Sequence, residues 1–363
     1  MALIDYKCPN CDGAINFDSE IQQMKCPFCD SAFDVESLKA YDDVLLKEQE
    51  AKQEEIEWSS HEDSKWQEGE EESMNVFACN SCAGEIIVDA TTAATSCPFC
   101  GSPVVMKGKL SGSARPDLII PFKLDKKAAQ ESLSKHLTGK RLLPGTFKSS
   151  KKLEEIKGVY VPFWLFDAEV DASMRYKATT IRSWSDAQYN YTETKFFNVV
   201  RKGNMAFDDV PVDASAKMSN DLMESIEPFD AKAAVPFQTA FLSGFLADKF
   251  DFCAEHCIER ANRRIKKSTE VAFSRTVTGY VSVSPEHRDI HLRKSTVKYA
   301  LLPVWVLNAK WQDKNYIFAM NGQTGKFVGD LPTDWGIFWR QLIIMAIIIT
   351  VVVNIIIMLM GGI

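Results

Sequence analysis

Cys8-Pro9-Asn10-Cys11 is followed after fourteen residues by Cys26-Pro27-Phe28-Cys29. Cys79-Asn80-Ser81-Cys82 is followed, again after fourteen residues, by Cys97-Pro98-Phe99-Cys100, and every cysteine of this second set lies 71 positions after its counterpart. Two residues between cysteines let the chain turn tightly, so that both sulfurs face one metal ion. The spacing therefore predicts two four-cysteine metal sites.

This spacing is typical of zinc ribbons, in which four thiolates bind one tetrahedral Zn²⁺. We expect two Zn²⁺ per chain, in structural rather than catalytic sites, because four cysteines leave no open coordination position. Redox chemistry by the Cys-x-x-Cys pairs is the alternative, but it needs a thioredoxin-like unit. Gly13 and Gly84 are expected at positive φ. The predicted ligands are Cys8, Cys11, Cys26, Cys29, Cys79, Cys82, Cys97 and Cys100.

The C-terminal end has 19 uncharged, mostly aliphatic residues, from Leu342 to Met360. This length matches the roughly 30 Å hydrocarbon layer of a bilayer, so we predict a transmembrane helix over 338–360 rather than a buried core helix. The N-terminus has no signal peptide pattern, which favours a tail-anchored, single-pass protein of the cell membrane. Basic residues precede the span and none follows it, so the N-terminal bulk is expected in the cytosol.

A polar stripe lies within the predicted span. Ala346, Thr350 and Asn354 recur every four residues and share one helix face. The stripe is interpreted either as a contact with another helix or as polar side chains that bond their own backbone. The pattern leaves both readings open.

Charge is concentrated between the two cysteine sets. Residues 41–75 contain 13 acidic and 3 basic residues, a net charge of −10 within a chain of net charge −7. The first half, around Val44–Lys47, has helix-forming residues, and the second half is typical of a solvated linker. A flexible spacer is favoured over a docking surface for a basic partner. The expected domains are 1–36 and 76–107 (zinc ribbons), 37–75 (acidic linker), 108–332 (α+β domain) and 338–360 (transmembrane helix).

The region 108–332 is expected to form an α+β domain with a curved antiparallel sheet. Asp125 is a good N-cap for a helix over Lys126–Leu137. Tyr160–Ala168 and Leu301–Ala309 are similar β-rich runs, which suggests a duplicated ββ unit. Further helices are expected over 216–226 and 249–272, and a hairpin turn over 322–325.

No catalytic constellation is evident. Cys253 and Cys257 share a helix face, but buried core positions are favoured over a metal site. His287 and His291 flank a predicted turn and are interpreted as surface residues. Both cysteine modules are acidic or free of basic residues, which argues against nucleic acid binding and favours contact with proteins.

These features together resemble a bacterial family of tail-anchored membrane proteins with two zinc ribbons of the transcription factor IIB type. The resemblance covers nearly the whole chain, and it includes both cysteine sets, Ile119–Asp125, Tyr160–Asp167 and Phe318–Pro332. It implies association with envelope-stress machinery, with phage-shock-type or flotillin-like scaffold proteins as partners.

The first hypothesis for function is a non-enzymatic adaptor or scaffold that organises protein partners at the cytosolic face of the membrane. A membrane-tethered regulator that binds nucleic acid is the second hypothesis. An enzyme acting through the region 108–332 is the third, and it requires a deep pocket with clustered titratable groups.

Overall fold

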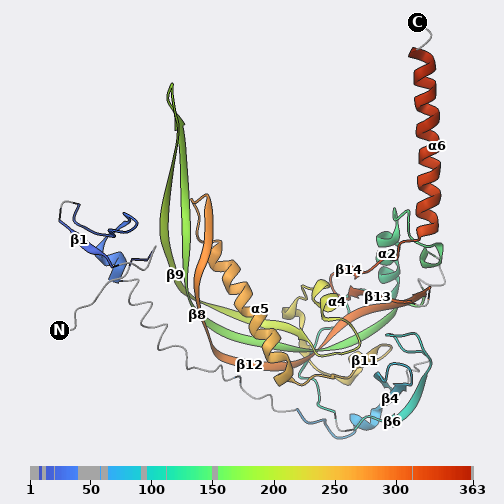
Figure 1. Cartoon of the computed structure of the whole chain (residues 1–363). Helices are drawn as coiled ribbons and strands as arrows, with labels where there is room; N and C mark the ends of the chain where they lie inside the picture. Colours follow the sequence, from blue (N-terminus) through green and yellow to red (C-terminus); the bar gives the residue numbers. More distant parts are fainter. Residues whose placement is uncertain are drawn as a thin grey trace. The chain divides into compact units, whose positions relative to one another are not determined.

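The computed structural model describes residues 8–9, 14–19, 21–39, 58, 64–90, 96–111, 113–148, 154–312 and 314–360. The chain divides into two compact units. Unit 1 comprises Met1–Ser59, Asp167–Asp208 and Arg260–Thr296, and unit 2 comprises Ser60–Phe166, Asp209–Glu259 and Val297–Ile363. Three long strands and one helix, β8 (Lys157–Ser185), β9 (Asn190–Asp213), β12 (Ser282–Trp311) and α5 (Ala254–Ser274), contribute residues to both units, and Figure 1 labels all four.

A large sheet forms the centre of unit 2. Its strand order is β10-β7-β12-β8-β11-β5-β4-β6, and β13 pairs with β12 and β14. The strands are β4 (Met74–Cys79), β5 (Glu85–Asp89), β6 (Val104–Lys109), β7 (Leu118–Ile119), β8 (Lys157–Ser185), β9 (Asn190–Asp213), β10 (Val235–Pro236), β11 (Leu246–Asp248), β12 (Ser282–Trp311), β13 (Lys314–Asn321) and β14 (Phe327–Gly329). The second cysteine module supplies β4, β5 and β6, which are part of this sheet. Strand β6 also crosses the boundary expected between residues 107 and 108, where the α+β domain is predicted to begin.

The sheet of unit 2 is mixed, so the predicted purely antiparallel arrangement is wrong. β11 runs parallel to β8, and β12 runs parallel to β7. The reason is that each of these partners arrives by a long connection rather than by a hairpin, and such connections allow parallel pairing. The hairpin expected at 322–325 is confirmed, because β13 and β14 pair antiparallel around it.

Both faces of this sheet are buried. In β8, every residue from Gly158 to Phe166 is buried, which explains the continuous apolar run in the sequence. One face packs against Met223, Ile226 and the second cysteine module. The other face packs, through residues of β12 and β13, against α2 (Lys126–Leu137) and Phe147. The hydrophobic core of unit 2 therefore consists of two layers, one on each side of the same strands.

The predicted helices are confirmed to different degrees. α2 spans Lys126–Leu137 as expected, and the Asp125 carboxylate accepts a hydrogen bond from the Ala128 amide at 2.8 Å. The helix expected over 216–226 is only α4 (Asn220–Ser225), because Ser219 caps it and the preceding residues form a polar network around Asp248. α5 (Ala254–Ser274) starts five residues later than expected. Short 3₁₀ turns are η2 (Glu71–Ser73), η3 (Gly145–Lys148), η4 (Ala231–Ala233) and η5 (Thr239–Leu242).

The two similar β-rich runs lie in neighbouring strands, β8 and β12. A polar-alternating extension follows each run in the sequence, Glu169–Thr180 after the first and Lys310–Ala319 after the second. The first run continues without interruption into its extension, as one strand of 29 residues. The second run ends in a turn, and its extension returns as β13. The runs therefore match in their buried parts and differ in their polar extensions.

Unit 1 contains the remaining parts of β8, β9 and β12, with β8 in the middle. Along β8, from Ala168 to Ala178, every second residue is buried. This alternation is that of a sheet with one covered face. The covering element is α5, whose Phe273 ring lies 3.6 Å from where a Cβ on Gly203 of β9 would sit.

The first cysteine module also belongs to unit 1. It has a small antiparallel sheet of β1 (Asn16–Asp18), β2 (Gln23–Lys25) and β3 (Ala32–Phe33). Ile15 and Leu38 are buried beside Cys8 and Cys26. Apart from these cysteines its core has few residues, as expected of a module that depends on a metal to fold.

Residues 64–73 do not form the solvated linker that their charge predicts. Glu70 makes a bidentate ion pair with Arg115 (2.9 Å and 3.2 Å), and both side chains are largely buried. The Trp66 indole donates to the carbonyl of Ser113. Prediction failed here because Arg115 lies 45 residues away in the sequence. The helix expected around Val44–Lys47 lies outside the described residues.

α6 (Trp335–Met360) is the one helix of the described chain that is long and apolar enough to cross a membrane. At about 1.5 Å per residue, its 26 residues span about 39 Å. The Asp334 carboxylate caps its first turn by accepting from the amides of Gly336 and Ile337. The Asp334 amide donates to the carbonyl of Leu142 at 2.9 Å.

The polar side chains within α6 bond their own helix. The Thr350 hydroxyl donates to the carbonyl of Ala346 at 2.8 Å, and the Asn354 amide donates to the carbonyl of Thr350 at 2.7 Å. Such bonds lower the cost of placing these groups in hydrocarbon. Contact with a second helix through this stripe remains a proposal.

Candidate metal centres

The second cysteine set forms a compact cluster. Its four sulfurs lie within 4.8 Å of one another, with Cys79–Cys100 at 3.4 Å and Cys82–Cys97 at 3.6 Å. These separations are far longer than the roughly 2.05 Å of a disulfide. A tetrahedral ion with metal–sulfur bonds of about 2.3 Å places its sulfurs about 3.8 Å apart. The cluster can therefore hold a metal ion with only small adjustments.

The first cysteine set forms a similar cluster from its described members. The sulfurs of Cys8, Cys26 and Cys29 lie within 4.8 Å of one another, and Cys8 and Cys29 are 3.5 Å apart. Cys11, the fourth predicted ligand, lies outside the described residues. The sequence repeat thus brings together seven of the eight predicted ligands, in two groups that can bind metal.

The backbone around the second cysteine pair is the same in both modules. The amides of Cys26 and Cys97 donate to the carbonyls of Ser31 and Ser102, at 2.9 Å and 2.8 Å. Positive φ occurs at Asp30 and at its counterpart Gly101. The expectation of positive φ at Gly84 is wrong, because Ala83 adopts it instead at φ 56°. A Cβ on Gly84 would make ordinary van der Waals contact with the Cys82 sulfur, at 3.4 Å, so space does not demand glycine there either.

Two lysines lie beside the second cluster. The Lys157 ammonium donates to the carbonyl and the hydroxyl of Ser96, directly before Cys97. The Lys217 Cε lies 3.6 Å from where a Cβ on Gly84 would sit. Burial lowers the pKa of Lys157, and the nearby Cys97 thiolate opposes that shift. Two cations therefore stand close to a site where four thiolates would carry excess negative charge.

Lys217 is part of a buried polar network. Its ammonium lies 3.2 Å from the fully buried Asp248 carboxylate and 2.7 Å from Asp251. The Ser215 hydroxyl donates to the other Asp248 oxygen at 2.6 Å. Burial acts against the charge on Lys217, yet Asp248 and Asp251 raise the pKa of this amine. The network joins the end of β9, the end of β11 and the second cysteine module.

Asp248 is a weaker acid than an ordinary aspartate. Burial raises its pKa to about 6, although the Lys217 ammonium and the Ser215 hydroxyl act in the opposite direction. The folded protein therefore binds this proton more tightly than the unfolded chain does. It follows that the Asp248 contribution to stability falls as the pH rises from about 4 through about 6.

The thiols of the second cluster differ in acidity. Burial raises the pKa of Cys97 and of Cys82. Burial also opposes ionisation of Cys100, but hydrogen bonds from the side chain and amide of Ser102 bring its pKa down to about 7. Of these three thiols, Cys100 loses its proton to a metal most readily.

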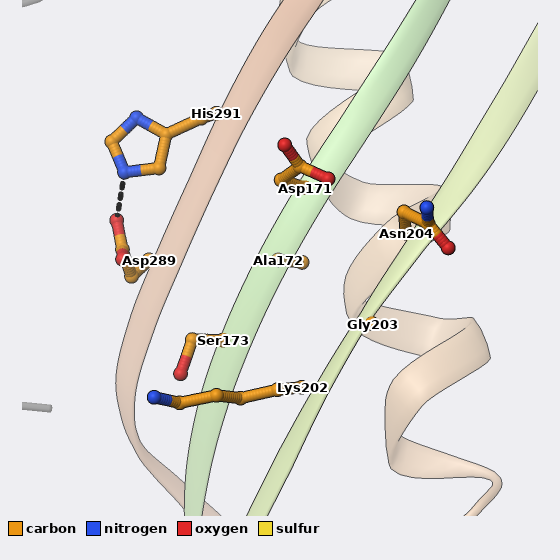
Figure 2. Close-up of a pocket in the computed structure, with 8 residues that line it drawn as sticks. All are labelled: Asp171, Ala172, Ser173, Lys202, Gly203, Asn204, Asp289 and His291. Carbon is orange, nitrogen blue, oxygen red and sulfur yellow. Dashed lines mark ion pairs between the residues drawn. The ribbon is translucent and has the colours of Figure 1, made fainter.

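A polar pocket of about 500 Å³ lies on unit 1. It is lined by Asp171, Ala172, Ser173, Lys202, Gly203, Asn204, Asp289 and His291 (Figure 2). The His291 imidazole pairs with Asp289 at 2.6 Å and is partly buried, so the predicted surface position for His291 is only partly right. The turn predicted between His287 and His291 is wrong, because both residues lie within β12. Ser173 points toward Lys202 rather than toward the imidazole, so these groups do not form a hydrolytic triad (Figure 2).

The two cysteines outside the clusters have different surroundings. Cys257 is buried, as predicted, and its thiol faces the carbonyl of Asp213 at 3.9 Å. Cys253 lies just before α5 and is only partly buried. Its sulfur lies 2.9 Å from the Nδ1 atom of His256. The two thiols therefore do not form a shared site.

Comparison with known proteins gives one informative relationship. An uncharacterized protein of Bacillus subtilis (strain 168), YdjG, is 33% identical over 334 residues, which cover 92% of this chain and 92% of YdjG. The chain belongs to the YdjG family. No protein-family model and no solved structure matches it. Because YdjG is uncharacterized, function has to be argued from the site itself.

Sequence reasoning found the cysteines and missed the lysines beside them. Lys157 directly precedes the buried part of β8, and Lys217 lies in a segment expected to be helical. No local pattern distinguishes these lysines from solvated ones. The fully buried Asp248 at the end of β11 was missed for the same reason.

Lys217→Met is expected to destabilise the protein strongly, because it leaves Asp248 buried without its cation. Loss of one partner of a buried pair costs about 3–5 kcal/mol. The loss in unfolding free energy should be larger at about pH 8 than at about pH 5, where Asp248 is mostly protonated. It can be measured by denaturant unfolding of the full chain in mild detergent.

Lys249→Met is the matched control, since Lys249 pairs with Glu85 nearer the surface, at 3.6 Å. Its cost should stay below about 1 kcal/mol. Addition of Asp248→Asn to Lys217→Met should recover much of the loss. Equal costs for the two lysine variants would contradict this account.

Proposed function

We propose that this protein is a non-enzymatic, membrane-anchored adaptor whose first cysteine module binds a protein partner. One observation carries the proposal. The two modules share the tip Cys-Pro-Phe-Cys, yet Phe99 is 3% exposed and Phe28 is 74% exposed. The same aromatic side chain is used for packing in one module and left uncovered in the other.

The second module illustrates how such a tip holds a protein surface. Phe99 packs in the core of unit 2 with Val161 and Val304 of the large sheet. The Asn308 side-chain amide donates to the Phe99 carbonyl, so the contact combines apolar burial with a hydrogen bond. In the first module, Phe28 offers the same ring and the same kind of backbone carbonyl to a partner. An exposed aromatic with a polar surround is typical of a protein-binding site.

In this proposal both cysteine clusters are zinc ribbons that hold one structural Zn²⁺ each. Four thiolates on a divalent ion carry a net negative charge, and the Lys157 ammonium beside Cys97 offsets part of it at the second site, whereas Lys217 is already paired with Asp248 and Asp251. From Cys8 to Asp34, the described residues include Asp18, Asp30 and Asp34 but only one lysine, Lys25. Zinc should therefore be held less firmly at the first site than at the second.

The proposal places the protein as a single-pass, tail-anchored membrane protein with both modules in the cytosol. α6 supports the membrane location, and exposed Trp335 and Trp339 at its start suit a bilayer interface. A reducing compartment suits unpaired thiols. Phage-shock-type or flotillin-like scaffold proteins of the envelope stress response are the proposed partners, by the family resemblance alone.

A membrane-tethered regulator that binds nucleic acid is the second candidate, and one observation favours it. Residues 260–275, mostly in α5, contain six basic residues and one acidic residue. Arg263, Lys266 and Lys267 are all exposed. Basic helix faces bind phosphate groups. The acidic character of the first module argues against this function.

Elemental analysis of the full chain should find two zinc ions per chain. Cys26→Ser and Cys97→Ser should each reduce this number to one, because three thiolates bind zinc more weakly than four. A chelator should remove zinc in two phases, and the faster phase should disappear in Cys26→Ser. Cys257→Ser is the control that retains both ions. One zinc or none in the unaltered protein would refute the zinc assignment.

Phe28→Ser should abolish partner capture while both zinc ions stay bound, because Phe28 is exposed and packs against no core of its own module. Site-specific photo-crosslinking from residue 28 in native membranes, followed by mass spectrometry, identifies the partner, and co-purification of that partner with each variant measures the capture. Val105→Ser, an exposed apolar position on the second module, is the control that should leave capture unchanged. Capture that is unaffected by Phe28→Ser would argue against the adaptor site.

Direct binding of DNA or RNA distinguishes the two candidates. The full chain in lipid nanodiscs should show no salt-dependent binding to either nucleic acid at low salt. If binding occurs and Lys266→Glu with Lys267→Glu removes it, the second candidate replaces the first. Fluorescence anisotropy of labelled oligonucleotides, at two or more salt concentrations, gives the measurement.

A further inference from the structure

Strands β8 and β9 extend as a two-stranded hairpin beyond the rest of unit 1 (Figure 1). The last backbone contact from the β12 side joins the Val281 amide to the carbonyl of Thr179, at 2.8 Å. Residues 180–195 therefore have no third strand beside them among the described residues. An isolated two-stranded hairpin is only marginally stable in water, so any apolar side chain on it requires an explanation.

One face of this hairpin continues the covered face of the sheet. Met174, Tyr176 and Ala178 of β8 are buried on that face, and α5 ends at Ser274. Because side chains alternate along a strand, Trp184 is on the same face as these buried residues. It stands beyond the end of the helix and is 47% exposed.

Three aromatic rings gather on this uncovered face. Trp184 stacks on Tyr191 at 5.6 Å, with an interplanar angle of 12°. Tyr189, 64% exposed, lies 6.3 Å from Tyr191. The Arg182 guanidinium lies over the Trp184 ring at 5.6 Å. We call these three aromatic residues the hairpin tip cluster.

The opposite face of the hairpin is apolar as well. Ile181 is 49% exposed and Phe196 is 55% exposed. The Lys177 ammonium lies 5.3 Å from the centre of the Phe196 ring. Ile181 thus projects from the opposite face of the hairpin, whereas Phe196 stands at its base and lines a cavity with Phe33 and Leu38 of the first cysteine module.

We propose that the tip of the β8–β9 hairpin inserts into the interfacial layer of the bilayer that α6 crosses. A folded protein partner would cover one face of the ribbon, whereas lipid surrounds both faces. Trp and Tyr prefer the headgroup region, where the ring is in apolar surroundings and the polar atom is hydrated. Arg182 can reach from such a position to the lipid phosphates.

The turn of the hairpin is held by hydrogen bonds to Asp186. Asp186 accepts hydrogen bonds from the amides of Gln188 and Tyr189 and from the Tyr191 hydroxyl. The Asp186 amide donates to the carbonyl of Tyr189 at 2.9 Å. The Asp186 carboxylate, the amides of Gln188 and Tyr189 and the Tyr191 hydroxyl are therefore paired within the turn, which lowers the cost of transferring these groups to the interface. Residues 180–195 contain two basic and two acidic residues, so insertion does not depend on anionic lipid.

Weak affinity of the hairpin tip for lipid is sufficient for insertion when α6 anchors the chain in the membrane. Because α6 fixes the chain to the same bilayer, insertion of the tip is an intramolecular step at a high effective concentration. The insertion also goes beyond the adaptor function, since it involves neither cysteine cluster and does not require a protein partner.

The test uses the fluorescence of Trp184 in the full chain, inserted into preformed phosphatidylcholine vesicles so that unit 1 remains outside. The Trp184 contribution is the emission of the unaltered protein minus that of Trp184→Phe. Acyl-chain-brominated lipid should quench this contribution at least about twofold, and external iodide should quench it less than in detergent. Tyr189→Ser with Tyr191→Ser should reduce the bromolipid quenching at least about twofold, because these rings share the interface with Trp184.

Trp66→Phe provides the control difference, because the Trp66 indole is bonded to the Ser113 carbonyl within unit 2 and should not respond to brominated lipid. Unchanged zinc content and circular dichroism exclude a folding defect in the variants. Free access of iodide without bromolipid quenching would overturn the proposal. Protection from iodide without bromolipid quenching would also overturn it, and would assign the cluster to a protein contact.

Discussion

The part of β8 that is buried on both faces is the constraint on which the rest of unit 2 depends. From Gly158 to Phe166 each side chain must find an apolar neighbour above or below the sheet. One layer is supplied by the second cysteine module. On the other face, Tyr160 packs against Phe122 and Phe245, and Trp164 packs against Phe250 and Tyr299. Neither layer could be removed without exposing a continuous apolar strand.

This arrangement links metal binding at the second cluster to the stability of the whole unit. Cys79 and Cys97 are members of the same core as Val159 and Val161. A metal ion that fixes these cysteines also fixes the layer that covers β8. The first cluster has no such role among the described residues, because its small core contains only its own residues. The two cysteine sets are alike in sequence, but only the second set is part of the core of a larger unit.

Features set by local chemistry could be predicted from the sequence. The cysteine spacing located both clusters, Asp125 located the start of α2, and a long apolar run located α6. Features set by distant residues could not. The parallel strand pairs depend on how long connections pack, and Glu70 is ordered by Arg115, 45 residues away. The first residues of the helix expected over 216–226 are not helical, because the chain there takes part in the polar network around Asp248. No local sequence pattern reveals this network. The candidate site shows the same difference between local and distant features. The metal ligands could be predicted because residue type and spacing identify them. Lys157 and Lys217 could not, because only folding of β8 and of the segment after β9 brings them close to the second cluster.

The joint between α6 and unit 2 has a mechanical consequence. The Asp334 amide is bonded to the Leu142 carbonyl, and the Asp334 carboxylate caps the helix that begins one residue later. The start of α6 is therefore attached to the segment that leads to Phe147, and this segment belongs to the layer that covers one face of the sheet. If α6 crosses a bilayer and tilts within it, the force on the helix reaches that layer through the hydrogen bond at Leu142.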